Sequence, residues 1–219
     1  MTLRMTFVAA LFAVLPACAD MPSILKLERV LDKPPKPAKL TVTVPSKAHQ
    51  YQRALTREAT FVFGVLAPVP LFAGQIAQES SWDCSVTAWD GGMGCAQFMK
   101  ATAGWLVREF PELGQVSAYD PVWAFQAQAR LNKFNYARVK GIDECNRWAA
   151  TLLAYNAGLG IVRIIQRQSP QPDVYWRVTE HERTSKQSEK NHASSRDYPH
   201  RITFKHQPTY ATWGRTVCL

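Results

Sequence analysis

Prolines and glycines divide the sequence between residues 51 and 168 into segments whose lengths suit α-helices. These breaks are Pro68, Pro70, Pro111, Pro121, Gly158 and Gly160. Between them, apolar residues recur three or four positions apart, which places them on one helical face. No long run in this region alternates apolar and polar residues as a half-buried strand would. The chain is therefore expected to be mainly α, with at most a small β element at the glycine-rich loop 90–94.

The same breaks set the expected bounds of the helices. Asp120 followed by Pro121 is a typical helix start, because the carboxylate can cap the first turn and proline tolerates its first position. The expected helices cover residues 51–63, 71–82, 97–110, 121–137, 143 to the break at 158–160, and a short stretch ending at Gln168.

The N-terminal region has the pattern of an exported protein. Residues 1–19 contain a basic start, a short apolar run and small residues, which is the order found in signal peptides. Cleavage at an A-x-A site, lipidation of Cys18 and a weak membrane signal anchor remain alternatives. Residues 20–50 are rich in proline and are expected to form an extended linker. We therefore expect an exported protein of the periplasm, with membrane anchoring through Cys18 or the signal segment as one option.

Cysteine usage agrees with export. Once Cys18 is removed or lipidated, the even set Cys84, Cys95, Cys145 and Cys218 remains, and it suits an oxidising compartment. Four cysteines allow three pairings. One pairing closes the short loop from Cys84 to Cys95 and joins Cys145 to Cys218. Four free thiols or an all-thiolate metal site remain alternatives, but no C-x-x-C pair occurs. No metal and no cofactor is expected.

The composition changes after residue 168, so we divide the folded part into a catalytic domain, 51–168, and a C-terminal extension, 169–219. The extension is charged at first and then aromatic, and it holds four of the five histidines. We expect the extension to pack back on the domain, with a disulfide through Cys218 as one way of holding it there; a disordered basic tail is the alternative. The protein is expected to be a monomer. The net charge of +9 suits a polyanionic partner without choosing one.

Glu79 is the strongest candidate for chemistry. It follows Phe72 and Ile76 at helical spacing, so its carboxyl group is expected to face the core. Burial raises the pKa of a carboxyl group and allows it to act as a general acid near neutral pH. A surface glutamate in a different helical register is the alternative.

Three segments in order carry a family resemblance. They are Gln78–Trp82, Gly91–Met99 followed by Ala101–Ala103, and Ala154–Gly158. Together they resemble the soluble lytic transglycosylase (SLT) family, which has a lysozyme-like α-helical domain. The resemblance covers roughly residues 70–165. Cys95-Ala96 stands where the family usually has Leu-Met, and Lys100 replaces its usual proline.

The resemblance implies a reaction on peptidoglycan glycan strands without a cofactor. Glu79 would protonate the bond between N-acetylmuramic acid (MurNAc) and N-acetylglucosamine (GlcNAc), and then take a proton as a 1,6-anhydro ring closes. Tyr155 would hydrogen-bond near Glu79 or the acetamido group. Ser80, Gln97 and Asn156 would orient the sugar.

Alternatives remain within and outside this family. Asp90, in a loop similar to that of goose-type lysozymes, could position a water and make the protein a hydrolase of the same bond. A non-catalytic murein-binding lipoprotein is a second alternative. Nucleic-acid binding conflicts with export, and no basic helix interleaved with aromatics is visible, so no nucleic-acid partner is expected.

The chemistry leaves the biological role open. The run Ser195–Ile202 resembles tails on phage and prophage members of the family, which serve host lysis. Remodelling of the host wall and passage for a secretion apparatus are the other candidate roles.

Overall fold

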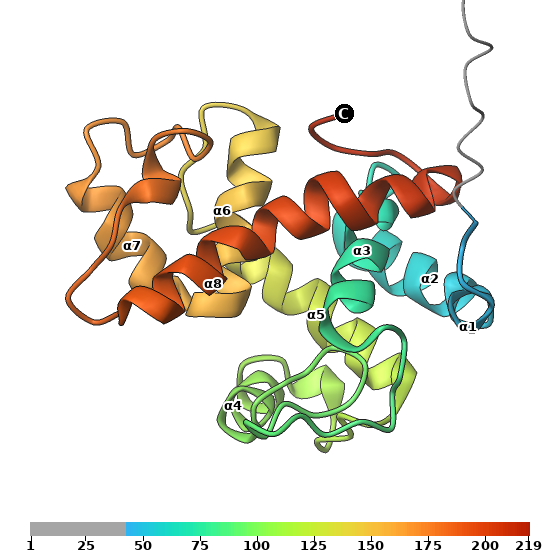
Figure 1. The fold of residues 1–219 in the computed structure, drawn as a ribbon. Coiled ribbons are helices and arrows are strands. Elements are labelled where there is room, and N and C mark those ends of the chain that lie inside the picture. Colours follow the sequence, from blue (N-terminus) through green and yellow to red (C-terminus); the bar gives the residue numbers. More distant parts are fainter. Residues whose placement is uncertain (1–42) are drawn as a thin grey trace, which may run out of the picture. The chain divides into compact units, whose positions relative to one another are not determined.

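The computed structural model describes residues 43–219, which are the coloured part of Figure 1. The expected signal peptide, Cys18 and the linker up to residue 42 lie outside the described residues. In residues 43–219, no helix combines the length and the apolar character needed to cross a membrane.

The described part is mainly helical, as expected. Its α-helices are α1 (Ser46–His49), α2 (Gln52–Phe63), α3 (Val69–Ser80), α4 (Lys100–Glu109), α5 (Pro121–Tyr136), α6 (Glu144–Ala157), α7 (Leu159–Gln168) and α8 (Glu189–His200). Short helical turns are η3 (Pro111–Leu113) and η4 (Thr179–His181). After α8 the chain continues through the π-helical η5 (Arg201–His206) and the 3₁₀-helical η6 (Gln207–Trp213).

Two local features differ from the sequence expectation. Residues 46–49, assigned above to the linker, form α1, and its Ala48 is buried. Helix α4 begins at Lys100 instead of Gln97, because Gln97 adopts a left-handed backbone conformation with φ of 51°. The glycine-rich loop does carry a small β element, made of the isolated antiparallel bridges Thr87–Met93 and Met93–Phe98.

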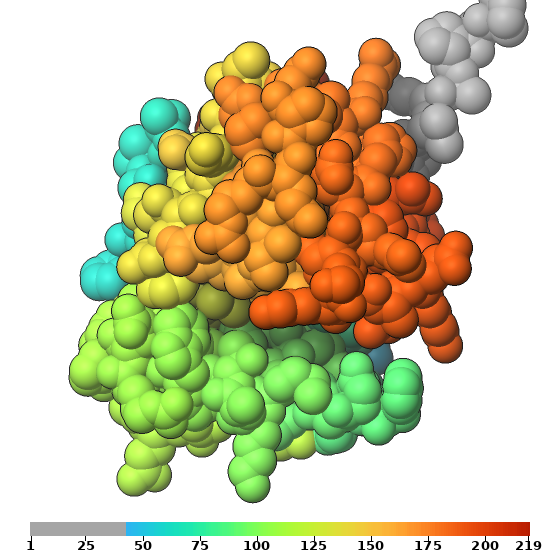
Figure 2. All heavy atoms as spheres, turned by 90° about the vertical axis from the view of Figure 1, so that its left-hand side faces the viewer, coloured from blue at the N-terminus to red at the C-terminus, as the bar shows by residue number. Residues whose placement is uncertain are grey.

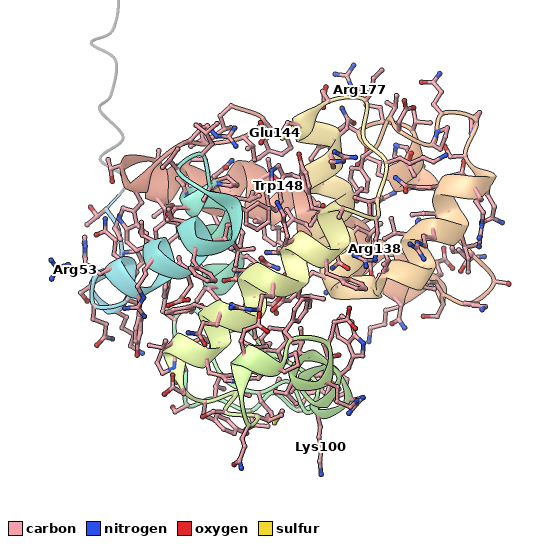
Figure 3. The ribbon with its side chains drawn as sticks, turned by 180° about the vertical axis from the view of Figure 1, so that it is seen from behind. Arg53, Lys100, Arg138, Glu144, Trp148 and Arg177 are labelled. Carbon is pink, nitrogen blue, oxygen red and sulfur yellow. A yellow bond between two sulfur atoms is a disulfide. The ribbon has the colours of Figure 1, made fainter. Side chains whose placement is uncertain are left out.

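Helix α3 lies at the centre of the core. Its residues Leu71, Phe72 and Ile76 are almost fully buried. Trp148 of α6 packs its ring 5.7 Å from that of Phe72, and Figure 3 shows it among the helices while Lys100 points outward. The last turn of α3, residues 77–80, is only partly buried, so a polar side chain on this turn can reach the protein surface.

The C-terminal extension packs back on the domain, and the disordered-tail alternative is wrong. Segments η5 and η6 run along α3, and their backbone comes so close that a Cβ on Gly74 would lie 2.9 Å from the Gln207 amide nitrogen. Gln207 is buried and exchanges hydrogen bonds with the backbone of Val217, at 2.9 and 3.0 Å. The extension is therefore part of the same core.

Two disulfides and one ion pair fasten this arrangement. Cys84 bonds to Cys95, and Cys145 on α6 bonds to Cys218, which is one of the three pairings left open by the sequence. The Arg215 guanidinium donates hydrogen bonds to both carboxylate oxygens of Glu144, at 2.6 and 2.7 Å. A disulfide across a long loop stabilises a fold largely by restricting the unfolded chain.

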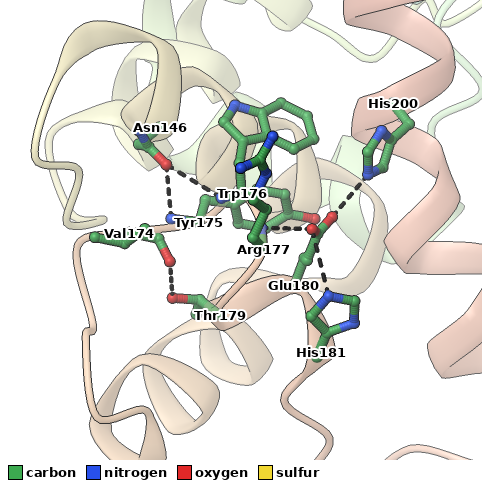
Figure 4. A network of polar contacts seen from close by, with 9 residues as sticks. All are labelled: Asn146, Val174, Tyr175, Trp176, Arg177, Thr179, Glu180, His181 and His200. Carbon is green, nitrogen blue, oxygen red and sulfur yellow. Dashed lines mark hydrogen bonds and ion pairs between the residues drawn. The ribbon is translucent and has the colours of Figure 1, made fainter. Parts of the chain in front are cut away.

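The segment before α8 is held by a polar network, shown in Figure 4. The Asn146 side-chain oxygen accepts hydrogen bonds from the backbone amides of Tyr175 and Trp176, at 2.8 and 3.1 Å. The buried Glu180 carboxylate accepts from the Arg177 amide and pairs with His200 Nε2 at 2.7 Å. Because His200 is the last residue of α8, this pair anchors that helix to the rest of the domain.

Candidate active site

A cavity of about 310 Å³ lies at the end of α3. It is lined by Glu79 from α3, Tyr155 and Asn156 from α6, and the glycine-rich loop with Trp89, Asp90, Gly92, Gln97, Phe98 and Met99. Figure 2 shows the surface hollowed between the green segment after α3 and the yellow to red segments that follow α5. Thr102 of α4 and Leu131 of α5 also line it, so the fold brings together residues from α3, the loop and α4, α5 and α6.

Glu79 is held by a hydrogen bond from a distant residue. The Tyr198 hydroxyl, on α8, donates to Glu79 Oε1. Gln75, one turn earlier on α3, donates from Nε2 to the Tyr198 oxygen at 3.2 Å. The side-chain oxygen Oε1 of Gln75 in turn accepts hydrogen bonds from the side-chain amides of Gln128 and Asn132 on α5, at 3.0 and 2.8 Å. This buried amide network orients the tyrosine that touches the acid.

The surroundings raise the pKa of Glu79 to about 7. Burial is the largest cause, since it disfavours the charged form. The hydrogen bond from Tyr198 acts in the opposite direction, and the negative charge of Asp90 adds a further rise. A carboxyl group with this pKa is partly protonated at neutral pH, so it can first donate a proton and then accept one.

Three of the four residues predicted to bind the sugar, Gln97, Tyr155 and Asn156, line the cavity. Gln97 donates from Nε2 to the Gly94 carbonyl at 2.8 Å, and a Cβ on Gly92 would lie 2.7 Å from its side-chain oxygen. Asn156 is exposed on the cavity wall. Tyr155 donates its hydroxyl to the Ala96 carbonyl at 2.8 Å and lies close enough to interact electrostatically with Glu79, but the hydrogen bond to Glu79 comes from Tyr198.

Ser80 and Asp90 differ in where they lie. Ser80 is not among the residues that line the cavity, and its hydroxyl turns back to the Ile76 carbonyl at 3.4 Å. Asp90 does line the cavity, where its side chain accepts from the Gly92 amide at 3.3 Å and acts electrostatically on Glu79. Residues 43–219 contain no cluster of three or more His, Cys, Asp or Glu side chains suited to a metal ion.

The sequence analysis missed two site residues. Tyr198 falls in the Ser195–Ile202 run, and Ser195, Tyr198 and Ile202 do share one buried helical face. That periodicity could have shown that Tyr198 is buried, but not that it reaches Glu79. Trp89 lines the cavity with 98% of its surface exposed, which is unusual for a large aromatic side chain.

Comparison with known proteins agrees with this geometry. The model of the family described as "Transglycosylase SLT domain" matches residues 67–175. No curated protein matches the sequence significantly. Residues 67–175 form a transglycosylase SLT domain, and this domain supports a function of the lytic transglycosylase type that acts on peptidoglycan. The matched part holds Glu79 and the cavity loop but ends before α8, so Tyr198 comes from outside it.

Proposed function

We propose that the protein is a lytic transglycosylase that cleaves the β-1,4 bond between MurNAc and GlcNAc without consuming water. The observation that carries this proposal is Glu79, a carboxyl group with a pKa of about 7 at the wall of a cavity that holds Gln97 and Asn156. In the first step, protonated Glu79 donates its proton to the glycosidic oxygen as the bond to MurNAc C1 breaks.

The second step returns the enzyme to its starting state. The MurNAc 2-acetamido group stabilises the positive charge at C1, and ionised Glu79 then removes the proton of the MurNAc 6-hydroxyl. The 6-oxygen bonds to C1 and closes the 1,6-anhydro ring. Tyr198 donates to the carboxylate during the ionised stage, while Gln97 and Asn156 lie where they can contact the sugar amide and hydroxyl groups.

Product analysis tests the proposal. Purified peptidoglycan is incubated with the protein, and the soluble fragments are analysed by mass spectrometry. Transglycosylation predicts fragments that end in 1,6-anhydroMurNAc, which lack one water relative to hydrolytic fragments. Release of reducing MurNAc ends would instead assign hydrolysis, and no release by folded protein would favour a murein-binding role.

The hydrolytic alternative has one supporting observation, the position of Asp90 on the same cavity wall. If Glu79 works alone, Asp90→Asn keeps the anhydro product. It also shifts the basic limb of the pH–rate profile to lower pH, because the negative charge of Asp90 helps to raise the pKa of Glu79. If Asp90 instead positions a water, Asp90→Asn loses activity both below and above pH 7. In that case the wild type releases fragments with reducing MurNAc ends.

Trp89 provides a second test. Its exposed ring suits stacking against the apolar face of a sugar, and such contacts contribute about 1 kcal/mol. Trp89→Ala is expected to raise KM about fivefold on soluble glycan oligomers with little change in kcat, whereas Trp89→Phe retains most of the affinity. Equal KM values for the wild type and both variants would remove Trp89 from the site.

We also propose export to the periplasm. The two disulfides support it, since such bonds persist mainly in oxidising compartments. Fractionation of cells that express the full chain tests this, because a reduced cytoplasmic protein would contradict the proposal. The same fractions, treated with detergent or salt, distinguish a soluble product from one anchored through its N-terminal region.

A further inference from the structure

A second hollow adjoins the candidate active site. It has a volume of about 320 Å³ and shares Asn156 with the cavity that holds Glu79. On its other side it is built by the segment before α8 and by α8 itself, with Lys186, Gln187, Asn191 and Ser194. None of these four residues lies in the stretch that the family model matches. The two hollows therefore meet at one exposed amide side chain.

The lining of the second hollow is polar and supplies mostly hydrogen-bonding groups. Lys186, Asn191 and Ser194 are exposed, and Asn156 and Asn191 carry amides that can both donate and accept. The side-chain oxygen of Gln187 is buried and has no hydrogen-bond partner in the protein. A buried acceptor without a hydrogen-bond partner costs free energy. A ligand N–H group that donated to this oxygen would therefore bind favourably.

The residues that line this hollow carry a net positive charge. No acidic residue lines the hollow itself, and Lys186 is its cation. Such a surface favours a ligand that carries both amides and carboxylates.

We propose that the second hollow binds the stem peptide of peptidoglycan, with Lys186 opposite a carboxylate of that peptide. The proposal rests on the proposed function, because the glycan must lie beside Glu79. The peptide is attached to the lactyl group of MurNAc, the sugar whose C1 reacts, so it leaves the chain next to the active-site cavity. In a peptide-bearing strand the lactyl carboxyl group of MurNAc is tied up in the amide bond to the peptide, so the two amino sugars carry no charge, whereas the peptide carries amides and free carboxylates. The hollow would thus make the enzyme prefer strands that still bear peptides.

Two substrates test this preference. One is purified glycan strands with their stem peptides. The other is the same strands after an amidase has removed the peptides and the freed lactyl carboxyl groups of MurNAc have been converted to uncharged methylamides. We expect the ratio of kcat/KM, peptide-bearing over stripped, to be well above one for the wild type. Lys186→Ala should lower that ratio about fivefold. Lys190→Ala is the matched control, because Lys190 is an exposed lysine at the start of α8 that does not line the hollow. It should leave the ratio unchanged.

A binding measurement separates this proposal from the proposed function. Soluble GlcNAc-MurNAc-peptide, and GlcNAc-MurNAc whose lactyl carboxyl group is an uncharged methylamide, are titrated into the wild type and Lys186→Ala by calorimetry. Tighter binding of the peptide-bearing ligand, lost in Lys186→Ala and weakened by salt, supports the subsite even if no strand is cleaved. Equal affinity for both ligands, or equal loss in Lys186→Ala and Lys190→Ala, overturns it even if the strands are cleaved as proposed.

Discussion

Replacing Glu79 by glutamine is expected to lower kcat on peptidoglycan by about a thousandfold or more. Glutamine keeps the shape of the side chain and an oxygen that can accept from Tyr198, but it has no proton to give and cannot take one. General acid–base catalysis contributes roughly 10²- to 10⁴-fold, and here one group serves in both steps. The release of 1,6-anhydro fragments measures the effect, and an unchanged circular dichroism spectrum shows that the fold is intact. Activity within tenfold of the wild type would exclude Glu79 as the acid.

The same variant should be more stable than the wild type at alkaline pH. The pKa of Glu79 is about 7 in the folded protein and close to its ordinary value of 4.5 in the unfolded chain. The folded state therefore holds the proton between these values, and stability falls as the pH rises from about 4.5 through 7. Glutamine removes this dependence, so we expect a gain on the order of 2 kcal/mol at pH 8 and little gain at pH 4. Denaturant titrations at both values check it. An equal effect at the two values would contradict the raised pKa.

Tyr198→Phe is expected to give the second largest loss of activity, with kcat lower by about ten- to a hundredfold. The tyrosine hydroxyl stabilises ionised Glu79, so its removal raises the pKa of the carboxyl group further. The basic limb of the pH–rate profile should therefore move to higher pH. Gln75 also loses a hydrogen-bond acceptor in the core, which costs about 1–2 kcal/mol of stability.

Tyr210→Phe is the matched control for this effect. Tyr210 also comes from the C-terminal extension and is buried, and its hydroxyl accepts from Trp82 Nε1 at 2.7 Å. It does not line the active-site cavity. A similar loss of stability is expected for both variants, but only Tyr198→Phe should shift the pH profile. A profile identical to the wild type in Tyr198→Phe would reduce Tyr198 to a packing residue.

The parts of this structure that depend on neighbouring residues could be predicted from the sequence. The buried face of α3, with Phe72 and Ile76, follows from the 3.6-residue period of the apolar residues. The same period predicted that the Glu79 carboxyl group faces the core. The cap at Asp120 is equally local, and its carboxylate accepts from the amides of Val122 and Trp123. The start of α4 was predicted too early, since the left-handed turn at Gln97 depends on the loop around it.

Contacts between residues that lie far apart in the sequence could not be predicted in this way. Tyr198 and Glu79 are 119 positions apart, and no periodicity links them. The division into a catalytic domain and an extension hid this pair, because it placed the two residues in different units. A family motif also indicates which residues belong to a site but not which atoms they contact. Ser80 is an example, because its hydroxyl bonds to the Ile76 carbonyl instead of facing the cavity.

The dependence of Glu79 on α8 has a consequence for the order in which the protein matures. Chains are made from their N-terminal side and domains begin to fold in that order, so α3 and its acid exist long before Tyr198 has been synthesised. Cys145 likewise waits for Cys218 before its disulfide can close. A nascent or interrupted chain would hold an acid without its partner. The acid on α3 thereby reaches its final environment only after the last helices of the chain have been made and packed against it.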